Sequence, residues 1–138
     1  MSLEPLQLWT AAGVLIGFQI SSFGWRISRE AEVDEAVATW LPPADIVNLI
    51  SMMITALGIF ILPILGLISV ELSQLVFGFA MLLFVGYPFA LAGHYDMYNK
   101  GPRSFQYFPR QEKIVIAIIA VAAVAYVILA TYRLVFAV

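Results

Sequence analysis

The segment IVIAIIAVAAVAYVILATY, residues 114–132, decides the fold class, because it runs for 19 residues without Asp, Glu, Lys or Arg. Three other segments of similar length, 5–25, 46–70 and 72–95, also lack these four residue types. A helix needs about 20 apolar residues to span a hydrocarbon core about 30 Å thick. Open strands are excluded there, because unpaired backbone groups in lipid are costly. The sequence therefore predicts an all-α integral membrane protein, a bundle of four transmembrane helices.

The composition agrees with this fold class. The chain is 62% hydrophobic and 12% charged, whereas a soluble domain is typically about 45–50% apolar and about 25% charged. We expect the first apolar segment to be retained, since residues 1–8 contain Glu4 but no basic residue of a signal peptide. The absence of cysteine excludes disulfides and thiolate metal sites. We expect one transmembrane domain over residues 1–138, with helices at about 5–28, 45–68, 71–94 and 110–135.

The basic residues predict the orientation in the membrane. Arg26 and Arg29 follow the first helix, and four more basic residues lie in the connection after the third. Only Arg133 is expected on the opposite side. Because cytoplasmic loops carry the excess of Lys and Arg, both termini are predicted to lie on the non-cytoplasmic side.

The connection after the first helix is predicted to be more than a linker. Val33, Val37, Trp40 and Leu41 recur at an amphipathic helical spacing. Pro42 and Pro43 then end the segment. We interpret residues 28–41 as an amphipathic extension of the first helix along the membrane surface, with a solvated acidic loop as the alternative.

The connection at residues 94–113 allows two interpretations. His94 and Asp96 could serve an interfacial enzyme, but a catalytic zinc needs three protein ligands and the chain has one histidine. Basic and aromatic residues instead favour an interfacial loop that contacts anionic headgroups. We therefore expect no catalytic residue, no metal and no cofactor. The residues expected to contact lipid headgroups are Lys100, Arg103, Arg110 and Lys113.

Two helices carry stripes of small or polar residues at helical spacing. The first helix carries Gly13, Gly17, Ser21 and Gly24, and the second carries Asn48, Ser51, Thr55 and Gly58. Small residues let helix backbones approach closely in lipid, and polar residues form hydrogen bonds between helices. Both stripes are predicted to be helix-packing surfaces, either inside one bundle or against another protein.

These features favour a non-catalytic membrane protein, a structural or accessory subunit of a homo- or hetero-oligomeric assembly. Its expected partners are membrane lipids and either itself or other membrane subunits, and no nucleic acid. The alternative is a small oligomeric channel or carrier for an uncharged solute, lined by Gln19, Asn48 and Thr55. An interfacial enzyme using His94 and Asp96 is the third hypothesis. A pump is disfavoured, because no ionisable residue lies in the middle of a predicted span.

Overall fold

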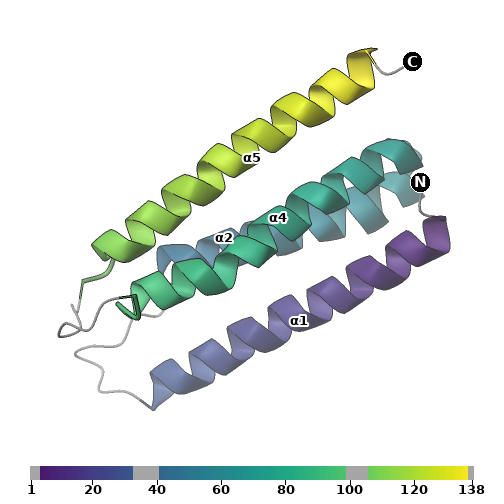
Figure 1. Cartoon of the computed structure of the whole chain (residues 1–138). Coiled ribbons are helices and arrows are strands. Elements are labelled where there is room, and N and C mark those ends of the chain that lie inside the picture. The colour runs from purple at the N-terminus through teal and green to yellow at the C-terminus, as the bar shows by residue number, and fades with distance from the viewer. Residues whose placement is uncertain (1–3, 33–40, 99–105, 137–138) are drawn as a thin grey trace.

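The computed structural model describes residues 4–32, 41–98 and 106–136, and the regular elements in these ranges are all helical. Four helices are long and apolar enough to cross a membrane, which confirms the predicted number. One of the four, Pro43–Ile64, is continuous although it contains three successive helical elements. The elements in chain order are α1 (Pro5–Ala31), α2 (Pro43–Thr55), η1 (Ala56–Ile61), α3 (Leu62–Ile64), α4 (Val70–His94) and α5 (Arg110–Phe136) (Figure 1).

The helix ends follow from local sequence. Glu4 and Gln7 form a capping box that satisfies backbone N–H groups at the start of α1. The Ser69 hydroxyl accepts a hydrogen bond from the Leu72 N–H and caps α4. Gly66 has a φ of 70°, a conformation that glycine adopts at no steric cost. This tight turn makes α2 and α4 neighbours, as the short connection predicts.

The second span contains a π-helical turn in its second half. In the π-helical turn η1, the Leu62 N–H donates to the carbonyl of Leu57, five residues earlier. Pro63 lies in the first turn of α3 and has no N–H to donate, so it cannot form the usual α-helical hydrogen bond. The π-helical turn therefore comes just before the residue that interrupts the α-helical hydrogen bonding. By contrast, α4 runs through Pro88 as one helix.

The four long helices are arranged with α2 and α4 in the middle and α1 and α5 on opposite sides of them (Figure 1). One apolar cluster joins α2, α4 and α5, and a second joins α1 to η1. Only 6% of the most apolar window of α5 is buried, so most of this helix presents apolar side chains outward. α1 begins and α5 ends at the same end of the molecule.

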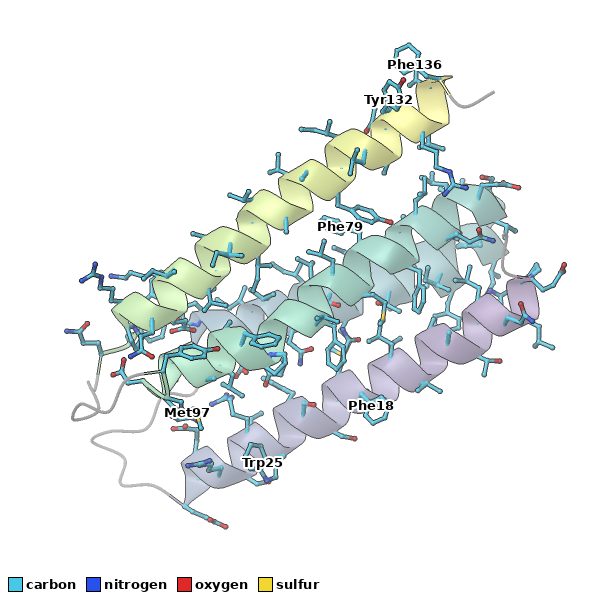
Figure 2. All side chains as sticks on the ribbon, in the orientation of Figure 1. Phe18, Trp25, Phe79, Met97, Tyr132 and Phe136 are labelled. Carbon is cyan, nitrogen blue, oxygen red and sulfur yellow. The ribbon has the colours of Figure 1, made fainter. Side chains whose placement is uncertain are left out.

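Large apolar side chains project from the outer helices (Figure 2). Phe18 and Trp25 project from α1, and Tyr132 and Phe136 from the end of α5, and all four are exposed. An exposed apolar surface of this extent suits hydrocarbon surroundings and would be unusual in a soluble monomer.

Parts of both predicted connections are helical. α1 continues to Ala31, so its last turn includes the start of the predicted 28–41 segment, while residues 33–40 lie outside the described ranges. His94, the residue shared by the predicted helix 71–94 and the predicted connection 94–113, is the last residue of α4. Lys100 and Arg103 also lie outside the described residues.

Candidate functional site

Ionisable and phenolic side chains gather at the end of the molecule where α1 and α4 finish and α2 and α5 begin. All four long helices contribute to this set, although its members are far apart in sequence. We refer to it as the ionic cluster. It consists of Arg26, Glu30, Asp45, Tyr87, His94, Tyr95 and Glu112.

The centre of the ionic cluster is an ion pair between α1 and α2. Arg26 Nε contacts Asp45 Oδ2, and both side chains are fully buried. The Tyr87 hydroxyl donates to the other carboxylate oxygen of Asp45 over 3.1 Å. Asp45 also lies in the first turn of α2, where the helix dipole favours a negative charge. The Asp45 carboxylate is thus stabilised by a cation, a hydroxyl and a helix terminus.

A second contact links the end of α1 to the residue that caps α4. The Tyr95 hydroxyl donates to Glu30 Oε1 over 2.5 Å, and Arg26 Nη1 lies 4.0 Å from the same oxygen. Burial, followed by the hydrogen bond to Glu30, raises the pKa of the Tyr95 phenol to about 12. The hydroxyl therefore stays protonated at neutral pH and remains a donor to Glu30.

The third contact joins α5 to both central helices. His94 Nδ1 lies 2.9 Å from Glu112 Oε2, and the Ala44 N–H donates to Glu112 Oε1 over 2.7 Å. Glu112 is fully buried. Through these two contacts its carboxylate lies at the N-terminus of α2, where the helix dipole favours a negative charge, and beside the last residue of α4. His94 was a candidate catalytic residue together with Asp96, whereas the structure brings His94 to Glu112.

The approach of α5 to α4 at this end depends on a glycine. A Cβ added to Gly93 would lie 2.8 Å from the backbone nitrogen of Glu112 and 3.0 Å from its Cα. Real Cβ atoms essentially never approach backbone this closely, so only glycine fits here. Gly93 therefore permits the backbone approach that brings His94 and Glu112 into hydrogen-bond distance.

Next to the ionic cluster, the inner face of α2 continues as a row of polar side chains. Gln19 Nε2 donates to Ser51 Oγ over 2.6 Å, and Ser51 Oγ donates to the Ala80 carbonyl over 2.7 Å. Asn48 Nδ2 donates to the Gln19 carbonyl, and Thr55 Oγ1 to the Ser51 carbonyl. Asn48 and Ser51 thus bond from α2 to neighbouring helices, whereas the buried Thr55 bonds within α2. Gly58 follows in η1, where it is buried against Val76.

Two acceptors in this row are buried without a hydrogen-bond partner among the described residues. They are Gln19 Oε1 and Asn48 Oδ1. Buried polar atoms without a partner are uncommon in proteins, because leaving them unsatisfied costs free energy. A small hydrogen-bond donor would satisfy them.

The small residues of α1 lie elsewhere. Within the described part of the chain, no atom lies within 4 Å of a Cβ built on Gly13, Gly17 or Gly24, and Ser21 is exposed. The buried face of α1 is formed by Leu8, Ala12, Leu15, Gln19, Arg26 and Glu30. At about 100° per residue, the two faces lie on roughly opposite sides of the helix. No described residue of the chain packs against this stripe, and its role as a helix-packing surface stays a prediction.

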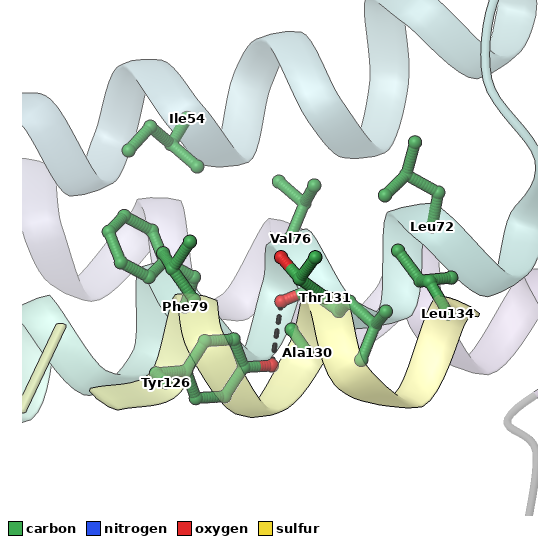
Figure 3. Close-up of a pocket in the computed structure, with 10 residues that line it drawn as sticks. Ile54, Leu72, Val76, Phe79, Tyr126, Ala130, Thr131 and Leu134 are labelled. Atoms are coloured by element: carbon green, nitrogen blue, oxygen red, sulfur yellow. Dashed lines mark hydrogen bonds between the residues drawn. The ribbon is translucent and has the colours of Figure 1, made fainter. Parts of the chain in front are cut away.

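A groove separates α4 from α5 at the end of the molecule opposite the ionic cluster (Figure 3). Its volume is about 250 Å³, and Ile54, Val76, Phe79 and Thr131 are among its mainly apolar lining residues. The Tyr126 hydroxyl is hydrogen-bonded to the Leu75 carbonyl over 2.7 Å. This hydroxyl thus helps to hold α5 to α4.

The basic residues predicted to contact lipid headgroups are only partly described. Arg110 is the first residue of α5 and is exposed, and Lys113 is also exposed. Lys113 Nζ lies 5.3 Å from the centre of the Phe108 ring. Both side chains are therefore free of the ionic cluster, and their contact with lipid stays a prediction.

The chemistry of the ionic cluster is that of a connection between helices. Its hydrogen bonds and ion pairs run mainly from one helix to another and link all four spans. Among the residues that the structure describes, no group of three His, Cys, Asp or Glu side chains could hold a metal ion. No protein-family model matches this chain, and neither a curated protein nor a solved structure is found to be similar to it.

Proposed function

We propose that this chain is a non-catalytic integral membrane protein that acts as a structural or accessory subunit of a homo- or hetero-oligomeric assembly. Four helices of sufficient length and apolarity support membrane insertion. The excess of basic residues in the connections supports an orientation with both termini outside the cytoplasm. Reporter fusions at the two termini test this orientation, and cytoplasmic activity from either would contradict it.

The open small-residue face of α1 carries the proposal. Gly13, Gly17 and Gly24 leave space around them that no described residue of the chain fills. In lipid, helices associate through close packing and not through the hydrophobic effect, and a flat small-residue face allows the closest approach. A second helix on this face would gain dispersion contacts along several turns.

The internal contacts of α1 support the same function. Its buried face is held to α2 by the Arg26–Asp45 ion pair and by the hydrogen bonds of Gln19. Because these contacts are directional, they fix the rotation of α1 about its own axis. The small-residue face is consequently presented outward in one orientation, as an interface requires.

Native mass spectrometry in lipid nanodiscs tests the proposal. The wild-type chain is expected to appear as an oligomer or with a stable protein partner. Gly17→Leu should reduce this association without unfolding the chain, because no described residue lies within 4 Å of a Cβ built at Gly17.

Ala11→Leu is the control, since it introduces the same side chain about 120° around α1 from Gly17. It should leave the assembly intact. A wild-type chain that is monomeric and without protein partners would overturn the proposal. Equal loss of association in both variants would show that the Gly17 face is not the interface.

The buried amides support a second candidate function, a small channel or carrier for an uncharged solute. Gln19 and Asn48 each have a buried oxygen without a partner among the described residues, and Ser51 and Thr55 extend the same row. Solute flux through reconstituted liposomes that falls in Gln19→Leu would favour this candidate. Liposomes that take up no small uncharged solute would exclude it.

A further inference from the structure

A second groove lies between α1 and α4, beside the ionic cluster. Its volume is about 420 Å³, and its accessible lining is mainly apolar. It lies within the two helices proposed to span the membrane. The groove is lined on α1 by Ser21, Ser22 and Trp25, and on α4 by Phe84, Tyr87 and Leu91.

An arginine is held at the surface end of this groove. The Arg29 guanidinium lies 5.8 Å from the centre of the Trp25 ring and 5.2 Å from that of Tyr95. Trp25 lines the groove, and Tyr95 follows Leu91, another lining residue, by one helical turn. Trp25 belongs to α1 and Tyr95 is the residue that caps α4, so Arg29 lies between the end of α1 and the end of α4. Trp25 projects from α1 at this end (Figure 2).

Among the described residues, no carboxylate forms an ion pair with Arg29. Glu30 is the carboxylate next to it in sequence, and its Oε1 accepts from the Tyr95 hydroxyl and lies near Arg26. Arg26 is fully buried and paired with Asp45, whereas Arg29 is exposed. Stacking on two aromatic rings restricts the guanidinium before any anion arrives, which reduces the entropy lost on binding.

We propose that this groove binds one acyl chain of an anionic phospholipid, with the lipid phosphate held by Arg29. An apolar groove beside a cation complements a lipid that joins a hydrocarbon chain to a phosphate with no neutralising positive charge of its own. A guanidinium matches phosphate geometry, and basic pockets between membrane helices bind anionic headgroups. Trp25 and Tyr87 form walls for the chain, and Arg29 selects the charge. The site is distinct from the lipid contacts predicted for Arg110 and Lys113.

Trp25 itself provides the measurement. In a Trp9→Phe/Trp40→Phe background, Trp25 is the one remaining fluorophore of its type. The full chain is reconstituted in phosphatidylcholine nanodiscs that contain a small fraction of lipid brominated on its acyl chains. Brominated phosphatidylglycerol and brominated phosphatidylcholine are compared at equal fractions. Phosphatidylglycerol should be enriched at Trp25 by about fivefold, the ratio for about 1 kcal/mol per basic residue near the membrane surface.

Arg29→Gln should abolish the difference between the two lipids. Arg110→Gln, which removes an exposed charge from the start of α5, should preserve it. Ser22→Phe, which fills the groove without removing Arg29, should also reduce the difference.

Each alternative occupant has its own result. Equal quenching by both lipids would overturn the proposal, and weak quenching by both would indicate that protein covers the groove. A difference that persists in Arg29→Gln, or that falls equally in Arg110→Gln, would show general surface attraction and not this site. Full retention of the difference in Ser22→Phe would exclude the acyl chain from the groove.

Discussion

Removing the arginine of the buried ion pair should destabilise the chain by about 3 kcal/mol, at the lower end of the range of about 3–5 kcal/mol for breaking such a pair. Arg26→Met removes the charge and keeps most of the side-chain volume. Asp45 is then left fully buried without its cation. Its hydrogen bond from Tyr87 and its position in the first turn of α2 remain, and each stabilises a carboxylate. These two remaining interactions are the reason for choosing the lower end.

A double-mutant cycle separates the ion pair from other effects of the substitutions. Asp45→Asn removes the negative charge and keeps a similar shape, and Arg26→Met/Asp45→Asn removes both charges. We expect the double variant to be more stable than the sum of the single effects predicts. Contacting residues typically show coupling of about 0.5–3 kcal/mol, and we expect about 2 kcal/mol here because both groups are fully buried.

The assay is reversible unfolding by sodium dodecyl sulfate in mixed micelles, followed by circular dichroism. Arg29→Met is the matched control, because Arg29 lies on the same helix but is exposed. It should change the free energy of unfolding by less than about 1 kcal/mol. Strictly additive effects of Arg26→Met and Asp45→Asn would refute the reasoning, since they would show that the two charges do not stabilise each other.

Three further predictions concern the end of the molecule that holds the ionic cluster and can be measured by thermal unfolding in detergent. Glu112→Gln should be milder than Glu112→Leu, which leaves the buried Ala44 N–H unpaired at a cost of about 1–3 kcal/mol; equal effects would contradict the assigned bond. Gly93→Ala should destabilise by about 1–3 kcal/mol through overpacking, whereas Gly17→Ala should stabilise by up to about 1 kcal/mol, because its methyl group meets open space among the described residues. The pKa of Tyr95 is raised from 10.0 to about 12, so its contribution is present below pH 10 and lost as the pH rises to 12; Tyr95→Phe should lose less stability across that window than the wild type, and an identical loss would argue against it.

The number of helices and the pairing of α2 with α4 could be predicted from sequence for simple physical reasons. Segments without charges and of membrane-spanning length identify helices independently of their partners. A short turn leaves two such helices no arrangement except as antiparallel neighbours. Neither inference requires knowing which side of a helix faces which neighbour.

The ionic cluster could not be predicted, because it depends on the rotation of each helix about its axis. From sequence, Asp45 and Glu112 are acids that suit the N-termini of their helices. Nothing local reveals that Glu112 also accepts from Ala44 or that Asp45 meets Arg26. A usable signal was present: the predicted topology puts Arg26, Asp45 and Glu112 on one side of the membrane. Charges that share a membrane side near helix ends are candidates for pairing.

Glycine spacing alone could not distinguish a buried helix face from an open one. Gly93 and Gly17 both lie in apolar helices, in stripes of small residues at intervals of three or four. The backbone of Glu112 lies against Gly93, whereas space remains open around Gly17 in the described structure. Whether another helix approaches a glycine closely depends on the atoms that an added Cβ would meet. Those atoms belong to a different helix, so the spacing of glycines within one helix does not reveal them.

Substitutions on the two faces of α1 should have different effects: those on the buried face should change the stability of the chain, and those on the open face should change its binding to a partner. Gln19 and Arg26 on the buried face bond to α2, so changes there disturb the packing of the chain itself. On the opposite face, a Cβ added to Gly17 would meet no atom of another described helix within 4 Å, so a side chain added there should leave the fold intact and change only the binding of a partner. If the proposed partner helix packs on this face, substitutions at Gly17 should change the association and those at Arg26 the stability, so the two measurements separate the fold from the proposed interface.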